Sequence, residues 1–179
     1  MIYVHLATGF EEVEAVTIAD VLRRAGLTAA LVSITGDKAV TGAHGITVTA
    51  DMLYEEADYE ACEMIVLPGG MPGTANLGAH EGLVKHIRCF AENDKYVAAI
   101  CAAPMVLGAA GVLDGKKATI YPGMEDKLGG GRHKKDPVVI DGKLITSMGP
   151  GTAMLFALEL VRQLAAKEIC EQVKKGLLV

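Results

Sequence analysis

One cysteine stands where a strand-like run turns directly into a helix-like one. Residues 96–100 read as a buried strand, and Ala102, Ala103 and Pro104 follow Cys101 without an intervening loop. Such a turn is typical of a nucleophile elbow, which raises a side chain above the sheet edge and requires small neighbours. A thiol at the start of a helix also experiences the positive end of the helix dipole, which favours thiolate. Cys101 is therefore a candidate nucleophile, although a lone cysteine is about as often a buried structural residue.

A carboxylate, Glu14, has an unusual place on the first predicted helix. On a helix that begins near Glu11, Glu14 falls in one row with Ile18 and Val21, beside the apolar stripe that would face the core. Burial of an unpaired carboxylate is costly and would raise its pKa, so that the group could stay protonated and donate a hydrogen bond to a thiolate. We favour this interpretation over an exposed carboxylate at the edge of the stripe.

Two glycine-bearing turns complete the candidate chemistry. Residues 67–74 (Leu-Pro-Gly-Gly-Met-Pro-Gly-Thr) follow a predicted strand and could present the amide of Gly70 to a developing anion. The turn at residues 147–152 contributes Gly149 and Pro150 to the candidate pocket, although the same residues could simply begin a helix. Neither turn has the pattern of a phosphate-binding loop or a complete dinucleotide fingerprint. We therefore expect no cofactor.

Alternating strands and helices must position these residues. The strands are predicted at 2–7, 28–34, 46–50, 64–67, 97–100, 117–120, 138–140 and 144–146, with a short hairpin within 36–45. The helices are predicted at about 11–25, 81–92, 102–110, 152–164 and 168–174. This alternation predicts α/β architecture with a mostly parallel sheet and helices on both faces. No repeat or linker divides the chain, so residues 1–179 form one domain, and ligands should bind at the carboxyl ends of the strands.

Composition and charge exclude several classes of protein. The 179 residues are 51% hydrophobic and 22% charged, which is typical of a globular core and not of a disordered chain. The net charge of −5 argues against a nucleic-acid binder. Residues 96–113 carry no charge, but Pro104 and two glycines favour a buried strand and helix over a membrane span. Without a signal-like N-terminus, we expect a soluble cytoplasmic protein.

The remaining metal-binding and redox residues show no pattern in the sequence. The four cysteines, Cys62, Cys89, Cys101 and Cys170, are widely spaced, so we expect neither disulfides nor a zinc knuckle, and no metal site. His44 lies in a glycine-rich turn from which it could reach a pocket or the partner subunit of a dimer.

Several motifs together make the chain resemble the ThiJ/PfpI family, in the branch of Parkinson disease protein 7 and its bacterial relatives. The matching motifs lie at residues 9–14 (Gly-Phe-Glu-Glu-Val-Glu), 22–26 (Leu-Arg-Arg-Ala-Gly), 66–70 (Val-Leu-Pro-Gly-Gly), 98–104 (Ala-Ala-Ile-Cys-Ala-Ala-Pro) and 144–152 (Leu-Ile-Thr-Ser-Met-Gly-Pro-Gly-Thr). They span nearly the whole chain in order. The resemblance implies a flavodoxin-like three-layer sandwich and a homodimer. It also implies a reactive, oxidation-sensitive Cys101 with Glu14 as its protonated partner, and an oxyanion hole formed by the amides of Gly70 and Ala102.

The resemblance also implies a function. It is that of a cofactor-independent glyoxalase or deglycase that uses Cys101 on methylglyoxal, glyoxal or their protein adducts. A redox-sensing stress-response chaperone or binding module without turnover is the alternative, and a peptidase is a distant third. Two residues depart from the family pattern. Tyr121 stands before Pro122 where a histidine is expected, and a phenol is a poor general base near neutral pH. His44 occupies the place of an arginine that reaches toward the cysteine across the dimer.

Overall fold

The central sheet of the computed structural model, which describes all of residues 1–179, has seven strands in the order β10-β11-β7-β6-β1-β2-β5. Only the β10–β11 pair is antiparallel. The strands of this sheet are β1 (Ile2–Leu6), β2 (Ala29–Ser33), β5 (Met52–Leu53), β6 (Met64–Leu67), β7 (Tyr96–Ile100), β10 (Val138–Asp141) and β11 (Leu144–Ser147). The predicted α/β class and mostly parallel sheet are confirmed.

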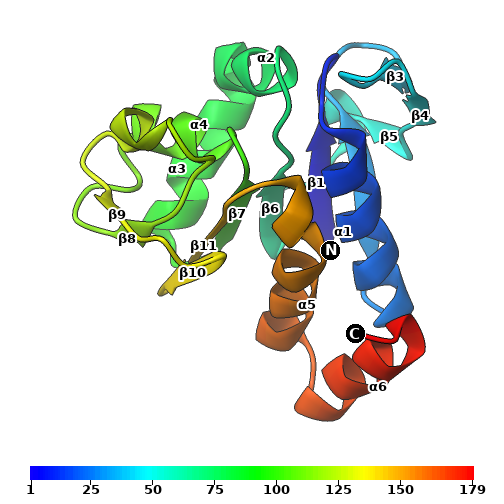
Figure 1. Cartoon of the computed structure of the whole chain (residues 1–179). Helices are drawn as coiled ribbons and strands as arrows, with labels where there is room; N and C mark the ends of the chain where they lie inside the picture. Colours follow the sequence, from blue (N-terminus) through cyan, green and yellow to red (C-terminus); the bar gives the residue numbers. More distant parts are fainter.

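Helices cover both faces of this sheet and make three layers (Figure 1). The helices are α1 (Glu12–Arg24), α2 (Gly73–Ala79), α3 (Glu81–Glu92), α4 (Pro104–Ala109), α5 (Ala153–Leu164) and α6 (Lys167–Leu177). Alternate residues of β1 enter two separate cores: Val4 belongs to the core that contains residues of α1, α5 and α6, whereas Tyr3 belongs to the core that contains residues of α2, α3 and α4. Strands buried on both faces explain the continuous apolar runs of the sequence.

Helix α1, which carries Glu14, forms as its sequence pattern predicts. Its buried side includes Ile18 and Leu22. Acidic residues occupy its first turn and arginines its last, which complements the helix dipole. Gly26, at φ +74°, then allows the chain to leave the helix in a left-handed conformation.

Short elements account for the differences from the predicted pattern. The hairpin has strands β3 (Ala39–Thr41) and β4 (Thr47–Thr49), which pair only with each other, so residues 46–50 do not enter the central sheet. Residues 117–120 also stay outside it, because β8 (Lys117–Ala118) pairs with β9 (Arg132–His133). The single-turn helices are η1 (Tyr54–Glu56), η2 (Glu125–Leu128) and η3 (Pro150–Thr152). No helix is both long and apolar enough to cross a membrane.

Candidate active site

Cys101 follows β7 directly and has a strained backbone. Its φ of +63° lies in the left-handed region, which non-glycine residues rarely adopt. Two hydrogen bonds hold this conformation: the Cys101 amide donates to the Ser147 carbonyl (3.0 Å), and the Tyr121 amide donates to the Cys101 carbonyl (2.8 Å). A strained residue held by its neighbours at the end of a parallel strand has the geometry of a nucleophile elbow.

The helix after Cys101 is shorter than its sequence predicts. Helix α4 begins at Pro104 rather than at Ala102, and it has six residues. Two residues therefore separate Cys101 from the helix, and so short a helix has a weak dipole. The contribution of this dipole to the thiolate stays a prediction, and the burial of Cys101 acts against it by raising the pKa of the thiol.

Glu14 is fully buried beside the elbow. Its Oε2 accepts a hydrogen bond of 2.7 Å from the amide of Gly69, while its Oε1 is buried without any hydrogen-bond partner. Burial raises the pKa of Glu14 to about 7, although the Gly69 amide and the Cys101 thiol partly offset this. Near neutral pH this carboxyl can therefore be protonated, as its place on the helix suggested.

The Cys101 thiol responds to the same surroundings. Burial raises its pKa well above the usual range, and the neighbouring charge of Glu14 raises it further. The amides of Gly70 and Ala102 act in the opposite direction by hydrogen bonding to the thiolate. The buried pair consequently holds one negative charge more easily than two, so a thiolate on Cys101 requires a proton on Glu14.

Gly69 is a site residue that the sequence analysis missed. A Cβ at this position would lie 2.6 Å from the Cβ of Cys101 and 3.0 Å from Oε2 of Glu14. Only glycine fits between the two functional side chains while its amide binds the carboxyl. The paired glycines at 69 and 70 were the available signal, but sequence alone could not show which of them faces Glu14.

The other predicted pocket residues divide into two groups. A Cβ at Gly149 would lie 3.3 Å from the Tyr121 ring and 4.0 Å from the Cys101 sulfur, so these residues border the thiol. Pro150 follows as the first residue of η3. His44 contacts Glu12 instead, with Nδ1 2.8 Å from its Oε2. The fold thus gathers Cys101, Glu14, Gly70, Ala102, Tyr121 and Gly149, and leaves His44 paired elsewhere within the chain.

Comparison with known proteins finds relatives over the full length of the chain. The protein dj-1beta of Drosophila melanogaster is 40% identical over 97% of this chain and 94% of its own length. Its crystal structure superposes with a TM-score of 0.95 over 99% of this chain and 97% of that one. The glutathione-independent glyoxalase DJR-1.2 of Caenorhabditis elegans is 32% identical over 93% of this chain and 89% of its own length.

Other relatives differ in length or in state. This chain covers only 41% and 46% of two Arabidopsis thaliana DJ-1 homologues, B and A, to which it is 40% and 38% identical. The structure of Toxoplasma gondii DJ-1 in an oxidized form superposes with a TM-score of 0.94 at 35% identity, over 99% of this chain and 97% of that one. Residues 1–163 match the sequence model of the DJ-1/PfpI family, and this chain therefore belongs to that family.

Proposed function

We propose that this protein is a cofactor-independent glyoxalase or deglycase that uses Cys101 as its nucleophile. The observation that carries this proposal is the buried pair of Cys101 and Glu14, with the amides of Gly70 and Ala102 directed at the sulfur. A relative with glyoxalase in its name supports the reaction class. The substrates would be methylglyoxal, glyoxal or their adducts on proteins.

The geometry suggests a sequence of proton movements for methylglyoxal. The Cys101 thiolate attacks the aldehyde carbon, and the aldehyde oxygen takes the proton that Glu14 carries to give a hemithioacetal, which leaves Glu14 as a carboxylate. The amides of Gly70 and Ala102 stabilise the negative charge on that oxygen before the proton arrives. The Glu14 carboxylate, with a pKa of about 7, can then take the proton from the former aldehyde carbon and return it to the neighbouring carbon, while the hydroxyl proton moves from the first oxygen to the second. The resulting thioester is hydrolysed by water to lactate, and the thiol is regenerated.

Substrate size follows from the exposure of the nucleophile. Cys101 is only 8% exposed, whereas Tyr121 at the rim is 47% exposed. A small dicarbonyl could reach the sulfur by passing the Tyr121 ring, but a protein-bound adduct would have to extend past it. We therefore favour free methylglyoxal or glyoxal over adducts on folded proteins.

Lactate formation from methylglyoxal by the purified protein tests the proposal. We expect turnover that disappears in Cys101→Ala and persists in Cys89→Ala, since Cys89 is an exposed thiol on α3. Turnover in Cys101→Ala equal to that of the wild type would refute the role of Cys101. No turnover in any form of the protein would refute the enzymatic function.

A redox-sensing binding module is the second candidate, and the same site supports it. An oxidised Cys101 would place sulfinate oxygens beside the Gly70 and Ala102 amides and the Glu14 carboxyl, which could stabilise them. The comparison with an oxidized relative favours this candidate.

Glu14→Gln separates the two candidates. The glutamine amide keeps a hydrogen-bond donor and an acceptor for Gly69 but cannot carry a proton between two carbons. We expect this variant to lose lactate formation and to retain Cys101 oxidation. Full turnover in Glu14→Gln would exclude Glu14 as the proton carrier.

A further inference from the structure

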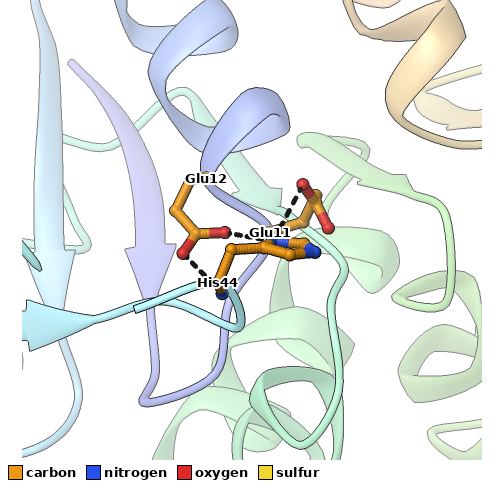
Figure 2. A group of neighbouring side chains, drawn as sticks. All are labelled: Glu11, Glu12 and His44. Atoms are coloured by element: carbon orange, nitrogen blue, oxygen red, sulfur yellow. Dashed lines mark hydrogen bonds and ion pairs between the residues drawn. The ribbon is translucent and has the colours of Figure 1, made fainter. Parts of the chain in front are cut away.

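A second cluster of potential ligands lies at the start of α1, apart from the cysteine. Glu11 immediately precedes α1, and Glu12 is the first residue of that helix. His44 lies in the turn of the β3–β4 hairpin. Figure 2 shows the three side chains directed toward one another. Nδ1 of His44 is 2.8 Å from Oε2 of Glu12 and 3.7 Å from Oε1 of Glu11. One ligand atom from each residue lies within 4.8 Å of the other two.

The most buried member, Glu12, is held in a fixed orientation. Its Oε1 accepts hydrogen bonds from the amides of His44 (2.7 Å) and Ile46 (3.3 Å), which leaves Oε2 facing the imidazole. A Cβ at Gly42 would overlap the Glu12 carboxyl, so the glycine turn makes room for it. Hydrogen bonds of this kind orient ligands and maintain their charge in protein metal sites.

The hairpin that carries His44 is also fastened to the segment before α1. The amide of Gly9 donates to the Thr41 carbonyl (2.9 Å), and that of Ala43 donates to the Phe10 carbonyl (2.8 Å). These backbone hydrogen bonds therefore hold His44 close to Glu12 and Glu11, which lie 32 and 33 positions before it in the sequence. The ligand atoms do not depend on a chance approach of flexible side chains.

The charge of the cluster favours a cation. Glu11 and Glu12 bring two carboxylates together, and no lysine or arginine forms an ion pair with either of them. His44 is their sole basic neighbour among the ion pairs, and even a protonated imidazole brings one positive charge against two negative ones.

We propose that Glu11, Glu12 and His44 bind a divalent transition-metal ion of borderline softness, with Zn²⁺ as the expected ion. One imidazole nitrogen and two carboxylate oxygens are ligands that suit Zn²⁺. In a tetrahedral site with metal–ligand distances of about 2.0–2.2 Å, ligand atoms are roughly 3.3–3.6 Å apart. The separations of 2.8 and 3.7 Å lie on either side of that range. The ion would replace any proton on Nδ1, which leaves to solvent, and water would fill the remaining position.

Exposure allows the adjustment that binding requires. Within a single chain the His44 side chain is 66% exposed and that of Glu11 is 13% exposed, so the ring can move while Glu12 stays in place. In the homodimer that the family resemblance implies, the same hairpin would face the partner subunit. Within one chain the cluster does not include the Cys101 thiol, so the proposal of a bound ion does not rest on the proposed glyoxalase reaction.

Titration of the full-length, metal-free protein with Co²⁺ tests the site, because cobalt reports its ligands spectroscopically. We expect one Co²⁺ per chain, with weak d–d absorption and no sulfur-to-cobalt charge transfer, and a competing Zn²⁺ titration that displaces it. His44→Ala and Glu11→Gln should each weaken binding at least ~10-fold. Glu11→Gln serves as the second variant, since the Glu11 side chain forms no hydrogen bond within the chain and its loss should not disturb folding.

Two controls make the outcome decisive. His133→Ala removes a histidine from β9, away from the cluster, and should leave the affinity unchanged. Cys89→Ala and Cys101→Ser remove the thiols that could bind the ion instead. Three outcomes would overturn the proposal. The first is binding that survives both His44→Ala and Glu11→Gln, and the second is a sulfur-to-cobalt charge-transfer band that disappears in either cysteine variant. The third is no binding at millimolar Co²⁺.

Discussion

At the scale of single residues, Glu14 should make the stability of the protein depend on pH. Burial raises its folded-state pKa from 4.5 to about 7, so the folded state binds this proton more tightly than the unfolded state. The contribution of Glu14 is therefore fully present below pH 4.5 and is lost as the pH rises through about 7. The loss amounts to about 3 kcal/mol at most. Urea unfolding between pH 5 and 8 should show a decrease in the wild type that is absent in Glu14→Gln.

The buried His5 changes the stability of the protein with pH in the opposite direction, so its contribution has to be separated from that of Glu14. Burial lowers the pKa of His5 to about 3, so stability from this residue is lost as the pH falls below 6.5. The difference between wild type and Glu14→Gln cancels the His5 contribution, because both proteins contain it. Parallel stability curves for the two proteins from pH 5 to 8 would show that Glu14 is ionised throughout.

The four cysteines should also differ in their reactivity with peroxide. Cys62 and Cys170 are buried away from the site. Burial raises the pKa of both Cys62 and Cys101, so burial alone does not distinguish these two thiols. Cys89 is exposed, and its sulfur accepts a single hydrogen bond from the Asn93 side-chain amide (3.6 Å), whereas the two backbone amides of Gly70 and Ala102 serve Cys101. We expect mild peroxide to add two oxygens to Cys101 first, as measured by peptide mass mapping. Oxidation of Cys89 before Cys101 would mean that exposure alone controls the reaction.

At the scale of elements, the turn at residues 68–70 lies so close to the elbow at Cys101 that this contact should be the one most sensitive to substitution. A Cβ in Gly69→Ala would lie 2.6 Å from the Cβ of Cys101, so the turn or the elbow must move. We expect a loss of about 1–3 kcal/mol in unfolding free energy and a large loss of Cys101 reactivity. The thiol alkylation rate and chemical denaturation would measure the two effects.

Gly78→Ala is the matched control for that substitution. Gly78 lies within α2, where a Cβ would make an ordinary contact of 3.5 Å with Val106. Alanine should be neutral or stabilise the helix by up to about 1 kcal/mol, with an unchanged alkylation rate. Equal effects of the two substitutions would indicate that Gly69 has no special role beside Cys101.

Sequence patterns predicted elements with a clear periodicity and missed those that depend on distant contacts. Helix α1 was predicted because its apolar residues recur at helical spacing over 13 residues. Helix α2 was missed, because its sequence is rich in glycine and lacks such a stripe. The start of α4 was misplaced, since the left-handed Cys101 is a consequence of the contacts with Ser147 and Tyr121. The approach of His44 to Glu12 depends on how the hairpin folds back, which no local pattern contains.

At the scale of the whole molecule, exposed apolar side chains favour the homodimer that the family resemblance implies. Val13 and Val16 on α1, Ile46 at the hairpin and Leu155 on α5 are each between 48% and 59% exposed. Helices α1 and α5 pack against each other, and the hairpin is fastened to the segment before α1. Large apolar side chains gathered on neighbouring elements are typical of protein–protein interfaces.

We therefore expect the protein to sediment at micromolar concentration with twice the 18.8 kDa mass of one chain. Val16→Glu should shift it to a monomer, because a symmetric interface would bury the new charge twice. Ile140→Glu is the matched control, since Ile140 is a 36% exposed apolar residue on the edge strand β10, and this variant should remain dimeric. A wild-type protein that sediments as a monomer would exclude the dimer. If Val16→Glu stays dimeric while Ile140→Glu dissociates, the subunits associate through the β10 edge instead of α1.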